Sequence, residues 1–386
     1  MTEPTDNKQT DAATPPAPQK TPQKAPPTPA KPAPESPAAG PVIHVAPSPH
    51  SFSTSLTTKR MMLDVLIATA PLVVWSIVQF GLGAVLQLAT CVIGCIVAEV
   101  VFTVMRGRCP LKAVKDLSAI VTGVILAMSL PGTAPWYVGI IAAGAAIGVG
   151  KVVFGGLGQN IFNPAMVGRA FVMICFAGAL AAGAYEVPAE DPDAETLNVV
   201  SQATPMSVLK TKVKDLKENP PAEDAENDES PVAISSLFMG NANGSIGEVS
   251  ALACLLGGLY LCLRRTAAWE IPLGVLGASA IVTLLVSLLG NAGGMSLLDF
   301  LAYHMLGGAL LFGAFYIATD PVSSPITPRG RLIFGVGLGL FIMLFRMMST
   351  FPEGVMFAVL MMNAIVPLIN RWTIPTPVGG PVPQRK

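Results

Sequence analysis

The sequence predicts an all-α polytopic membrane protein with about ten transmembrane helices in two inverted five-helix repeats. Composition is the first indication, because 52% of the 386 residues are hydrophobic and only 12% are charged, whereas soluble domains are about 25% charged. Recurring long apolar segments are the second, since about 20 apolar residues cross the ~30 Å hydrocarbon layer. The third is a match between the two halves of the chain. The formal net charge is zero, so there is no basic field to attract nucleic acid.

Residues 1–50 form a tail rich in proline, alanine, lysine and threonine. The tail has no apolar core, so we expect no secretory signal peptide in it. Because it cannot bury enough apolar surface to order itself, we expect disorder or partial polyproline II structure. Two roles remain open for it: a spacer, or a flexible arm that meets a soluble partner.

Ten apolar segments are each expected to cross the membrane once. The first repeat, 51–184, contains the segments 62–80, 84–105, 117–131, 135–154 and 165–184. The second repeat, 248–372, contains the segments 248–263, 271–290, 298–318, 332–347 and 353–371. A long polar segment, 185–247, separates the repeats, and a short tail, 373–386, ends the chain.

Basic residues in the short connections indicate the orientation, because Lys and Arg accumulate on the cytoplasmic side. With ten spans, they fall on one side, at Lys59, Arg60, Arg106, Arg108, Lys112, Lys115, Lys151, Arg264, Arg265, Arg329, Arg331, Arg371, Arg385 and Lys386. Arg346, at the far end of span nine, is the main exception. Both termini are therefore expected in the cytoplasm and the acidic segment 185–247 outside.

A shift of 190 residues brings all five spans of the two halves into register. Matched pairs include Gly123 with Gly313, Pro131 with Pro321, and Pro135 with Pro325. Because five is an odd number, the second half must enter the membrane upside down relative to the first. Inverted repeats place a site between the halves, and helices interrupted by Gly and Pro mark it. Here those segments are 117–135 and 304–325.

Two turns offer both a structural and a functional reading. In the turn Gly155–Ala165, Asn163 suits an N-cap and Pro164 the first helical position. The backbone N–H groups of such a turn can also hold a phosphate or the polar edge of a ring. In Gly244–Glu248, Ser245 either caps span six or lines a cofactor pocket with Glu248.

Carboxylates inside a membrane are costly and therefore suggest function. Glu99 is the deepest of them, within span two; a path for an ion or a proton competes there with a buried hydrogen bond to a neighbouring helix. Asp320 and Glu353 lie at predicted span ends and are further candidates for the same path. No metal site is expected, because the membrane part has a single histidine, His304. Cys91 and Cys95 share a helix face, which permits metal binding but is more typical of small buried apolar residues.

The hexapeptide Ser201–Met206 lies in the long polar segment. A Ser/Thr pair before a proline is most often a turn. The hexapeptide also resembles the Ser-Gly-Ala-Thr flavinylation motif, whose threonine is esterified to the phosphate of FMN. It keeps Ser201, Ala203 and Thr204, followed by Pro205, but has Gln202 in place of glycine. Upstream, Asn198 stands where the motif often has aspartate. The resemblance implies that Thr204 carries covalent FMN.

Several motifs, in the same order, are similar to those of the D subunits of Rnf electron-transport complexes and the homologous B subunits of sodium-translocating NADH:quinone reductases. The resemblance covers about residues 48–372, and the shorter front end favours the Rnf type. The motifs are Lys59–Val65, Gly155–Ala165, Ser201–Met206, Gly244–Glu248, Ala318–Val322 and Phe351–Val355.

The resemblance implies a redox-driven translocase that exchanges electrons between ferredoxin and NAD⁺ and moves Na⁺ or H⁺. This chain would relay electrons through covalent FMN, in the inner membrane of a bacterium or archaeon, with a noncovalent riboflavin deeper in the membrane by analogy. Implied partners are A-, B-, C-, E- and G-type subunits, above all the FMN-bearing G type on the outer face, and a flavin transferase. The chain has no nucleotide-binding fingerprint, so NAD⁺ is expected on another subunit. Cofactor contacts would include Thr204, Ser201, Ala203, Pro205, Ser245, Glu248 and Asn163.

Other classes of function fit the same layout, because a fold does not fix a function. One is a channel or transporter without redox chemistry, and another is a structural anchor for soluble subunits. Fluorescence of the denatured protein in a gel separates them, because only a covalent flavin survives denaturation.

Overall fold

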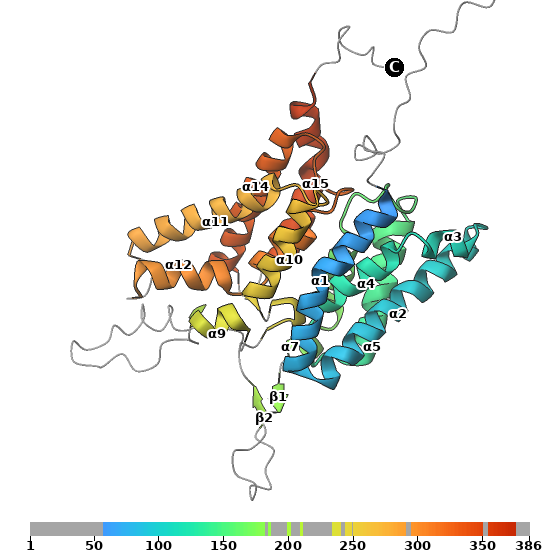
Figure 1. Ribbon diagram of the computed structural model, residues 1–386, viewed down its shortest axis with the longest axis horizontal. Helices are drawn as coiled ribbons and strands as arrows, with labels where there is room; N and C mark the ends of the chain where they lie inside the picture. Colours follow the sequence, from blue (N-terminus) through green and yellow to red (C-terminus); the bar gives the residue numbers. More distant parts are fainter. Residues whose placement is uncertain are drawn as a thin grey trace, which may run out of the picture. The chain divides into compact units, whose positions relative to one another are not determined.

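A computed structural model describes residues 57–181, 184–186, 199–201, 209–210, 234–240, 244–248, 250–290, 295–349 and 354–375. The chain divides into two units, Met1–Val45 and Ala46–Lys386, and every described residue belongs to the second. The predicted tail 1–50 and most of the segments 185–247 and 373–386 lie outside the described residues. In the described part, the fold is almost entirely helical (Figure 1).

The first half of the chain is a series of helices that follow the predicted spans. These are α1 (Thr58–Phe80), α2 (Leu82–Met105), α3 (Pro110–Val114), α4 (Ser118–Ser129), α5 (Trp136–Ile147), the π-helix η1 (Gly148–Val152), α6 (Pro164–Cys175) and α7 (Ala177–Ala181). The fifth predicted span is too long at its end, because Ala184 belongs to a strand. Strands β1 (Ala184–Glu186) and β2 (Val199–Ser201) pair antiparallel, and Tyr and Val at these positions favour strand over helix.

The second half contains equivalent helices and more breaks. Its elements are α9 (Ile234–Met239), the 3₁₀ turn η2 (Ile246–Glu248), α10 (Ala251–Leu263), α11 (Glu270–Leu288), α12 (Leu297–Leu306), α13 (Leu310–Phe312), the π-helix η3 (Gly313–Ile317), α14 (Pro328–Met348) and α15 (Val355–Thr373). Each predicted span of this half therefore contains a helix.

Five helices of the described chain are long and apolar enough to cross a membrane: α1, α2, α11, α14 and α15. A sixth crossing results if α12 and the segment Leu310–Ile317, which bend by 54° against each other, form one broken span. The prediction of an all-α polytopic membrane protein is confirmed.

The remaining apolar helices, α4, α5 with η1, α6 and α10, are shorter than a membrane crossing. A helix of 12 residues such as α4 rises only about 18 Å, less than the ~30 Å hydrocarbon layer. Their ends therefore leave backbone groups that other protein groups or a water-lined cavity must satisfy. The count of ten full crossings stays a prediction, and these helix ends are where polar contacts should gather.

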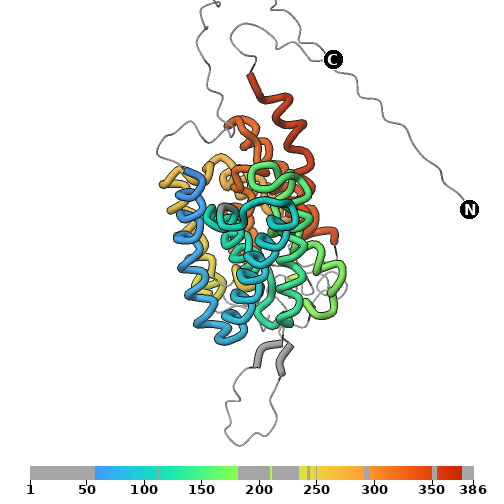
Figure 2. The backbone as a smooth tube through the Cα atoms, turned by 90° about the vertical axis from the view of Figure 1, so that its right-hand side faces the viewer, coloured from blue at the N-terminus to red at the C-terminus, as the bar shows by residue number. Residues whose placement is uncertain are grey.

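Helices that are equivalent under the 190-residue shift meet between the halves. Helix α1 packs against α10, and α6 packs against α15 (Figure 2). Within each half, α2 packs on α5 as α11 packs on α14. A repeat related by a two-fold axis has this contact pattern, while the inversion of the second half stays a prediction. The packing depends on close backbone approach: a Cβ on Gly123 of α4 would lie 2.7 Å from the Cα of Val92 in α2.

Candidate functional site

A cavity lies where the ends of α1, α4, α6 and α10 meet the two π-helices. It holds about 790 Å³ of empty space, including space open to solvent. Both of the Gly/Pro-interrupted segments contribute to it, with Ser118 and Ile125 from one and Tyr316 and Asp320 from the other. The cavity therefore occupies the position between the halves that the repeat indicates. Its polar lining residues are Ser118, Thr122, Lys151, Asn160, Asn163, Thr266, Tyr316, Thr319 and Asp320.

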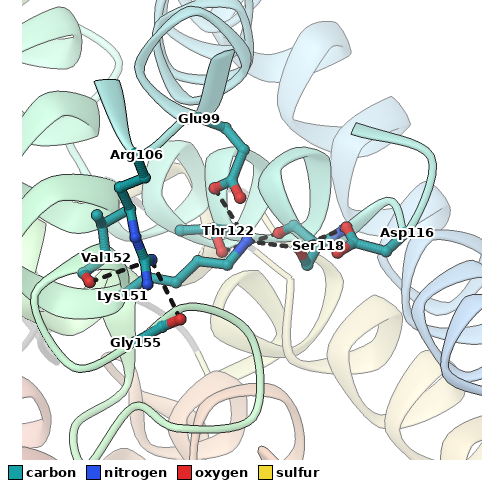
Figure 3. A network of polar contacts seen from close by, with 8 residues as sticks. All are labelled: Glu99, Arg106, Asp116, Ser118, Thr122, Lys151, Val152 and Gly155. Atoms are coloured by element: carbon teal, nitrogen blue, oxygen red, sulfur yellow. Dashed lines mark hydrogen bonds and ion pairs between the residues drawn. The ribbon is translucent and has the colours of Figure 1, made fainter. Parts of the chain in front are cut away.

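A buried ion pair borders this cavity (Figure 3). The ammonium Nζ of Lys151, in η1, lies 2.9 Å from Oε2 of Glu99 in α2, and both side chains are less than a tenth exposed. Lys151 also donates to the Oγ of Ser118 at 2.7 Å. The Ser118 hydroxyl in turn donates to Oδ1 of Asp116 at 2.7 Å. A chain of polar groups thus links the half-buried Asp116 to the buried Glu99.

This pair corrects the interpretation of Lys151 as a charge in a connection between spans. Lys151 is 2% exposed and lies inside η1, so it carries no information about orientation. Burying the Lys151 ammonium without a partner would be costly, and the ion pair with Glu99 offsets that cost. The alternative to an ion path at Glu99 was a buried hydrogen bond to a neighbouring helix. Glu99 does have a partner on another helix, and the contact is an ion pair. An ion path through Glu99 stays a prediction.

The turn between η1 and α6 contains three glycines and is stabilised by hydrogen bonds from Arg106. Gly155, Gly156 and Gly158 have positive φ values, which glycine adopts without strain. The Arg106 guanidinium donates to the Gly155 carbonyl at 3.1 Å, and more weakly to the Val152 carbonyl at 3.5 Å, at the end of η1 (Figure 3).

Asn163 performs the predicted capping role and a second one. Its Oδ1 accepts from the N–H groups of Ala165 and Met166, at 3.0 and 3.3 Å, at the start of α6. Its Nδ2 donates to the carbonyl of Ile317, at 3.3 Å, in η3 of the other half. With the Asn363 amide assigned from its hydrogen-bonding partners, the Asn363 oxygen accepts from the Asn163 N–H at 3.0 Å. Asn163 is therefore a polar link between the halves, on the cavity wall.

Asp320 closes the turn that follows η3. Its Oδ1 accepts from the N–H of Val322 at 3.3 Å, and its Oδ2 accepts from the hydroxyl of Ser323 at 2.8 Å. The residue also lines the cavity. Glu353, the other predicted member of the ion path, lies outside the described residues.

A buried carboxylate that the sequence did not single out joins α1 to the turn after α10. Asp64 is 2% exposed. Its Oδ2 accepts from the hydroxyl of Thr266 at 2.9 Å, and its Oδ1 accepts from Arg264 at 3.3 Å and from the Tyr260 hydroxyl at 3.4 Å. Its position in the basic motif Lys59–Val65 was the available signal. Met61, Met62, Val65 and Thr266, beside it, line the cavity.

Replacing Asp64 with Asn is expected to lower the free energy of unfolding by about 1–3 kcal/mol, because the amide removes the charge that Arg264 faces and turns an acceptor into a donor. Thermal unfolding of the detergent-solubilised chain measures the loss. The matched control is Asp299→Asn, whose carboxylate faces Ser296 on the exposed start of α12. Equal losses in the two variants would contradict a special role for Asp64.

Ser245 and Glu248 lie at the other end of the molecule from Asn163. The Ile246 N–H donates to the Leu130 carbonyl at 3.1 Å, and Ser245 pairs with Pro131, just beyond the end of α4. The cavity borders the opposite end of α4, at Ser118. The three residues therefore do not form one pocket.

The structure also corrects the capping alternative for Ser245. Helix α10 is capped by Ser250, whose side chain accepts from the N–H of Ala253. The Ser245 hydroxyl instead donates to the Glu248 carboxylate, within reach of solvent at this end. The role of Ser245 and Glu248 in holding a cofactor stays a prediction.

The predicted flavin attachment site is only partly covered by the structure. The backbone of Ser201 ends β2, while Ala203, Thr204 and Pro205 lie outside the described residues. Described residues resume at Leu209, which is 2% exposed and packs with Leu237 and Tyr303. The structure therefore describes Ser201 and Leu209, which flank the predicted attachment residue.

Lys210, next to Leu209, donates to the carbonyl of Ser349 at the end of α14, at 2.8 Å. Burial, and then the charge of Arg346, lower the pKa of Lys210 below its ordinary value. The hydrogen bond to a helix C-terminus favours the charged ammonium and opposes this shift.

Among the described residues, no group of three or more His, Cys, Asp or Glu side chains is placed to hold a metal ion. Cys91 and Cys95 are fully buried, and Cys91 makes weak contacts with Gln87 and the Gly139 carbonyl.

Comparison with known proteins gives a family match that covers all of the described residues. The model of the NQR2, RnfD, RnfE family matches residues 44–379. The D subunit of the ion-translocating oxidoreductase complex of Stutzerimonas stutzeri is 38% identical over 338 residues, 83% of this chain and 92% of that protein. The D subunit of the Na(+)-translocating ferredoxin:NAD(+) oxidoreductase complex of Acetobacterium woodii is 38% identical over 333 residues, 86% of this chain and 93% of that protein.

A third relative differs in the ion that its name gives. The D subunit of the proton-translocating ferredoxin:NAD(+) oxidoreductase complex of Clostridium ljungdahlii is 35% identical over 339 residues, 88% of this chain and 96% of that protein. Matches at this level extend over the helices of both halves and over the segment between them. The chain is a multi-pass membrane protein that belongs to the NQR2, RnfD, RnfE family.

Proposed function

We propose that the chain is the membrane subunit of an ion-translocating ferredoxin:NAD⁺ oxidoreductase complex, and that it relays electrons through FMN esterified to Thr204. The observation that carries the proposal is the match, over 83–88% of the chain, to the D subunits of such complexes. The family match at residues 44–379 includes the hexapeptide Ser201–Met206. Within that hexapeptide, Thr204 supplies the hydroxyl that a flavin transferase requires.

Contacts at the two ends of α1 support an outward-facing attachment segment. Near the start of α1, Asp64 pairs with the basic residue Arg264. Near its end, Trp75 donates to the carbonyl of Gly240 at 3.3 Å, within the C-terminal part of the polar segment 185–247. The positive-inside rule puts the Arg264 end in the cytoplasm, so the attachment segment would face the outside.

In this arrangement, the flavin supplies the redox chemistry and the protein positions it. The proposed partners are the other subunits of the complex, of A, B, C, E and G types, with the FMN-bearing G type exchanging electrons on the outer face. Ferredoxin and NAD⁺ would react at other subunits. The transported ion is Na⁺ or H⁺, and Glu99 and Asp320, both beside the cavity, are the described candidates for its path.

A second, noncovalent flavin, riboflavin, is proposed for the cavity. The lining of the cavity is mostly apolar with a few placed polar groups, which is typical of cofactor sites. Met62, Val65, Ile125 and Leu261 supply apolar walls. Lys151 supplies a charged donor, so the residues present fit a flat ring with one polar edge.

The test of the covalent cofactor is the intact mass of the chain purified from cells that hold the flavin transferase. We expect the mass of the polypeptide plus one FMN ester, and a fluorescent band after denaturing electrophoresis. A bare polypeptide mass would reject the relay and favour a channel, which ion flux into vesicles without any electron donor would reveal. Riboflavin released by acid precipitation measures the noncovalent cofactor separately.

A further inference from the structure

The ammonium of Lys151 has one more hydrogen-bond donor than the protein uses. An ammonium carries three N–H donors. Two of them reach Glu99 Oε2 and Ser118 Oγ, and the described residues provide no third partner. The side chain is 2% exposed and belongs to the cavity wall. A charged donor without a partner in so buried a place is costly, so the cavity should contain a group that accepts it.

Several other polar side chains in or near the cavity wall already have partners. Asn163 uses its oxygen on the start of α6 and its nitrogen on the Ile317 carbonyl. Asp320 faces Val322 and Ser323. Arg106, the nearest guanidinium in the network of Figure 3, binds the carbonyls of Val152 and Gly155. Among the described residues that line the cavity, Lys151 is the only cation.

We propose that Lys151 donates its third hydrogen bond to the electron-rich edge of the reducible ring in the cavity, and that Glu99 and Lys151 together set the reduction potential of that ring. The inference rests on the proposed noncovalent flavin. Lys151 contacts the ring directly, and Ser118 and Glu99 are the positioning residues that hold its ammonium in place.

Because Lys151 and Glu99 carry opposite charges, removing one or the other should shift the reduction potential of the ring in opposite directions. Each electron that enters the cavity adds negative charge there, and no covalent bond is formed to the protein. The Lys151 ammonium stabilises the added charge, and the Glu99 carboxylate behind it opposes it. Both effects are strong because the pair lies in a low-dielectric interior. Removing the cation should therefore lower the potential, and removing the carboxylate should raise it.

The experiment uses the whole complex carrying Thr204→Val, so that flavin held at Thr204 does not contribute to the signal. The FMN of the G-type subunit is common to all variants and cancels when they are compared. Riboflavin content after acid precipitation and the midpoint potential from spectroelectrochemistry are measured for Lys151→Met, Glu99→Gln and the double variant. We expect Lys151→Met to weaken riboflavin retention on the order of tenfold or more, the usual effect of losing a charged hydrogen bond. The riboflavin that remains should have a lower potential, Glu99→Gln should have a higher one, and the double variant should fall between them.

Two further variants keep the test decisive. Lys151→Arg retains the charge and should retain riboflavin, and Lys115→Met, which removes an exposed cation near the same end of the molecule, should leave the potential unchanged. If Lys151→Met does not fold, the double variant is compared with Glu99→Gln and should have the lower potential. Shifts of the same sign in both single variants, or riboflavin bound with an unchanged potential, would overturn the inference. A parent complex that binds no riboflavin would instead remove the proposed cofactor itself.

Discussion

Thr204→Val abolishes the covalent flavin and with it electron transfer from ferredoxin to NAD⁺: this is the expected result with the largest effect. Valine preserves the shape of threonine but lacks the hydroxyl that forms the ester with the FMN phosphate. The measured mass should fall to that of the polypeptide, and the fluorescent band should disappear from denaturing gels. The riboflavin in the cavity should remain, because none of the residues that line the cavity belongs to the segment 185–247.

Gln202→Gly is the matched control for the attachment reaction. It restores the glycine of the flavinylation motif next to the acceptor, so the fraction of flavinylated chain should stay equal or rise. A fluorescent band that persists in Thr204→Val would move the attachment to another residue and reject Thr204 as the acceptor.

Hydropathy predicted where the helices lie, but not how far each extends across the membrane. Residues buried against protein and residues facing lipid are equally apolar, so a short interior helix such as α4 has the same signature as a crossing. In α4 nearly every side chain is buried, which marks it as enclosed by other helices. The structural consequence, a cavity at the helix ends, depends on contacts between the halves that local sequence does not encode.

The attachment hydroxyl could be predicted from the sequence, whereas the residues beside the cavity could not. Thr204 is recognisable because a transferase reads a short continuous peptide. The Lys151–Glu99 pair joins residues that are 52 positions apart, and Lys151 lies near the predicted turn between spans four and five. The prediction that Lys151 is a loop charge was wrong, because its partner Glu99 is distant in the sequence. No role was predicted for Asp64 for a similar reason, since its partners lie about 200 positions along the chain.

Arg346 was the main exception to the rule that basic residues lie on the cytoplasmic side. Its packing explains the exception. It is 1% exposed, so it is an internal cation that topology rules do not cover. Its two terminal nitrogens donate to the carbonyls of His304 and Gly307, at 2.6 and 2.8 Å, where α12 ends and the chain bends toward α13. Gly308 follows with a positive φ of 70°, and a Cβ there would lie 2.8 Å from Arg346 Nη2.

Arg346→Leu is therefore expected to destabilise the second half by about 3 kcal/mol or more, because two carbonyls at a helix break inside the membrane lose their donors where water cannot replace them. Thermal unfolding in detergent, followed by labelling of the buried Cys254, measures the loss. Arg331→Leu is the control: that side chain is half-buried and donates to the Pro325 carbonyl through Nε, so its loss should cost less than about 1 kcal/mol. Gly308→Ala should resemble Arg346→Leu, since a methyl group there displaces the guanidinium. Equal stability of the two arginine variants would mean that the break between α12 and α13 is held by other contacts.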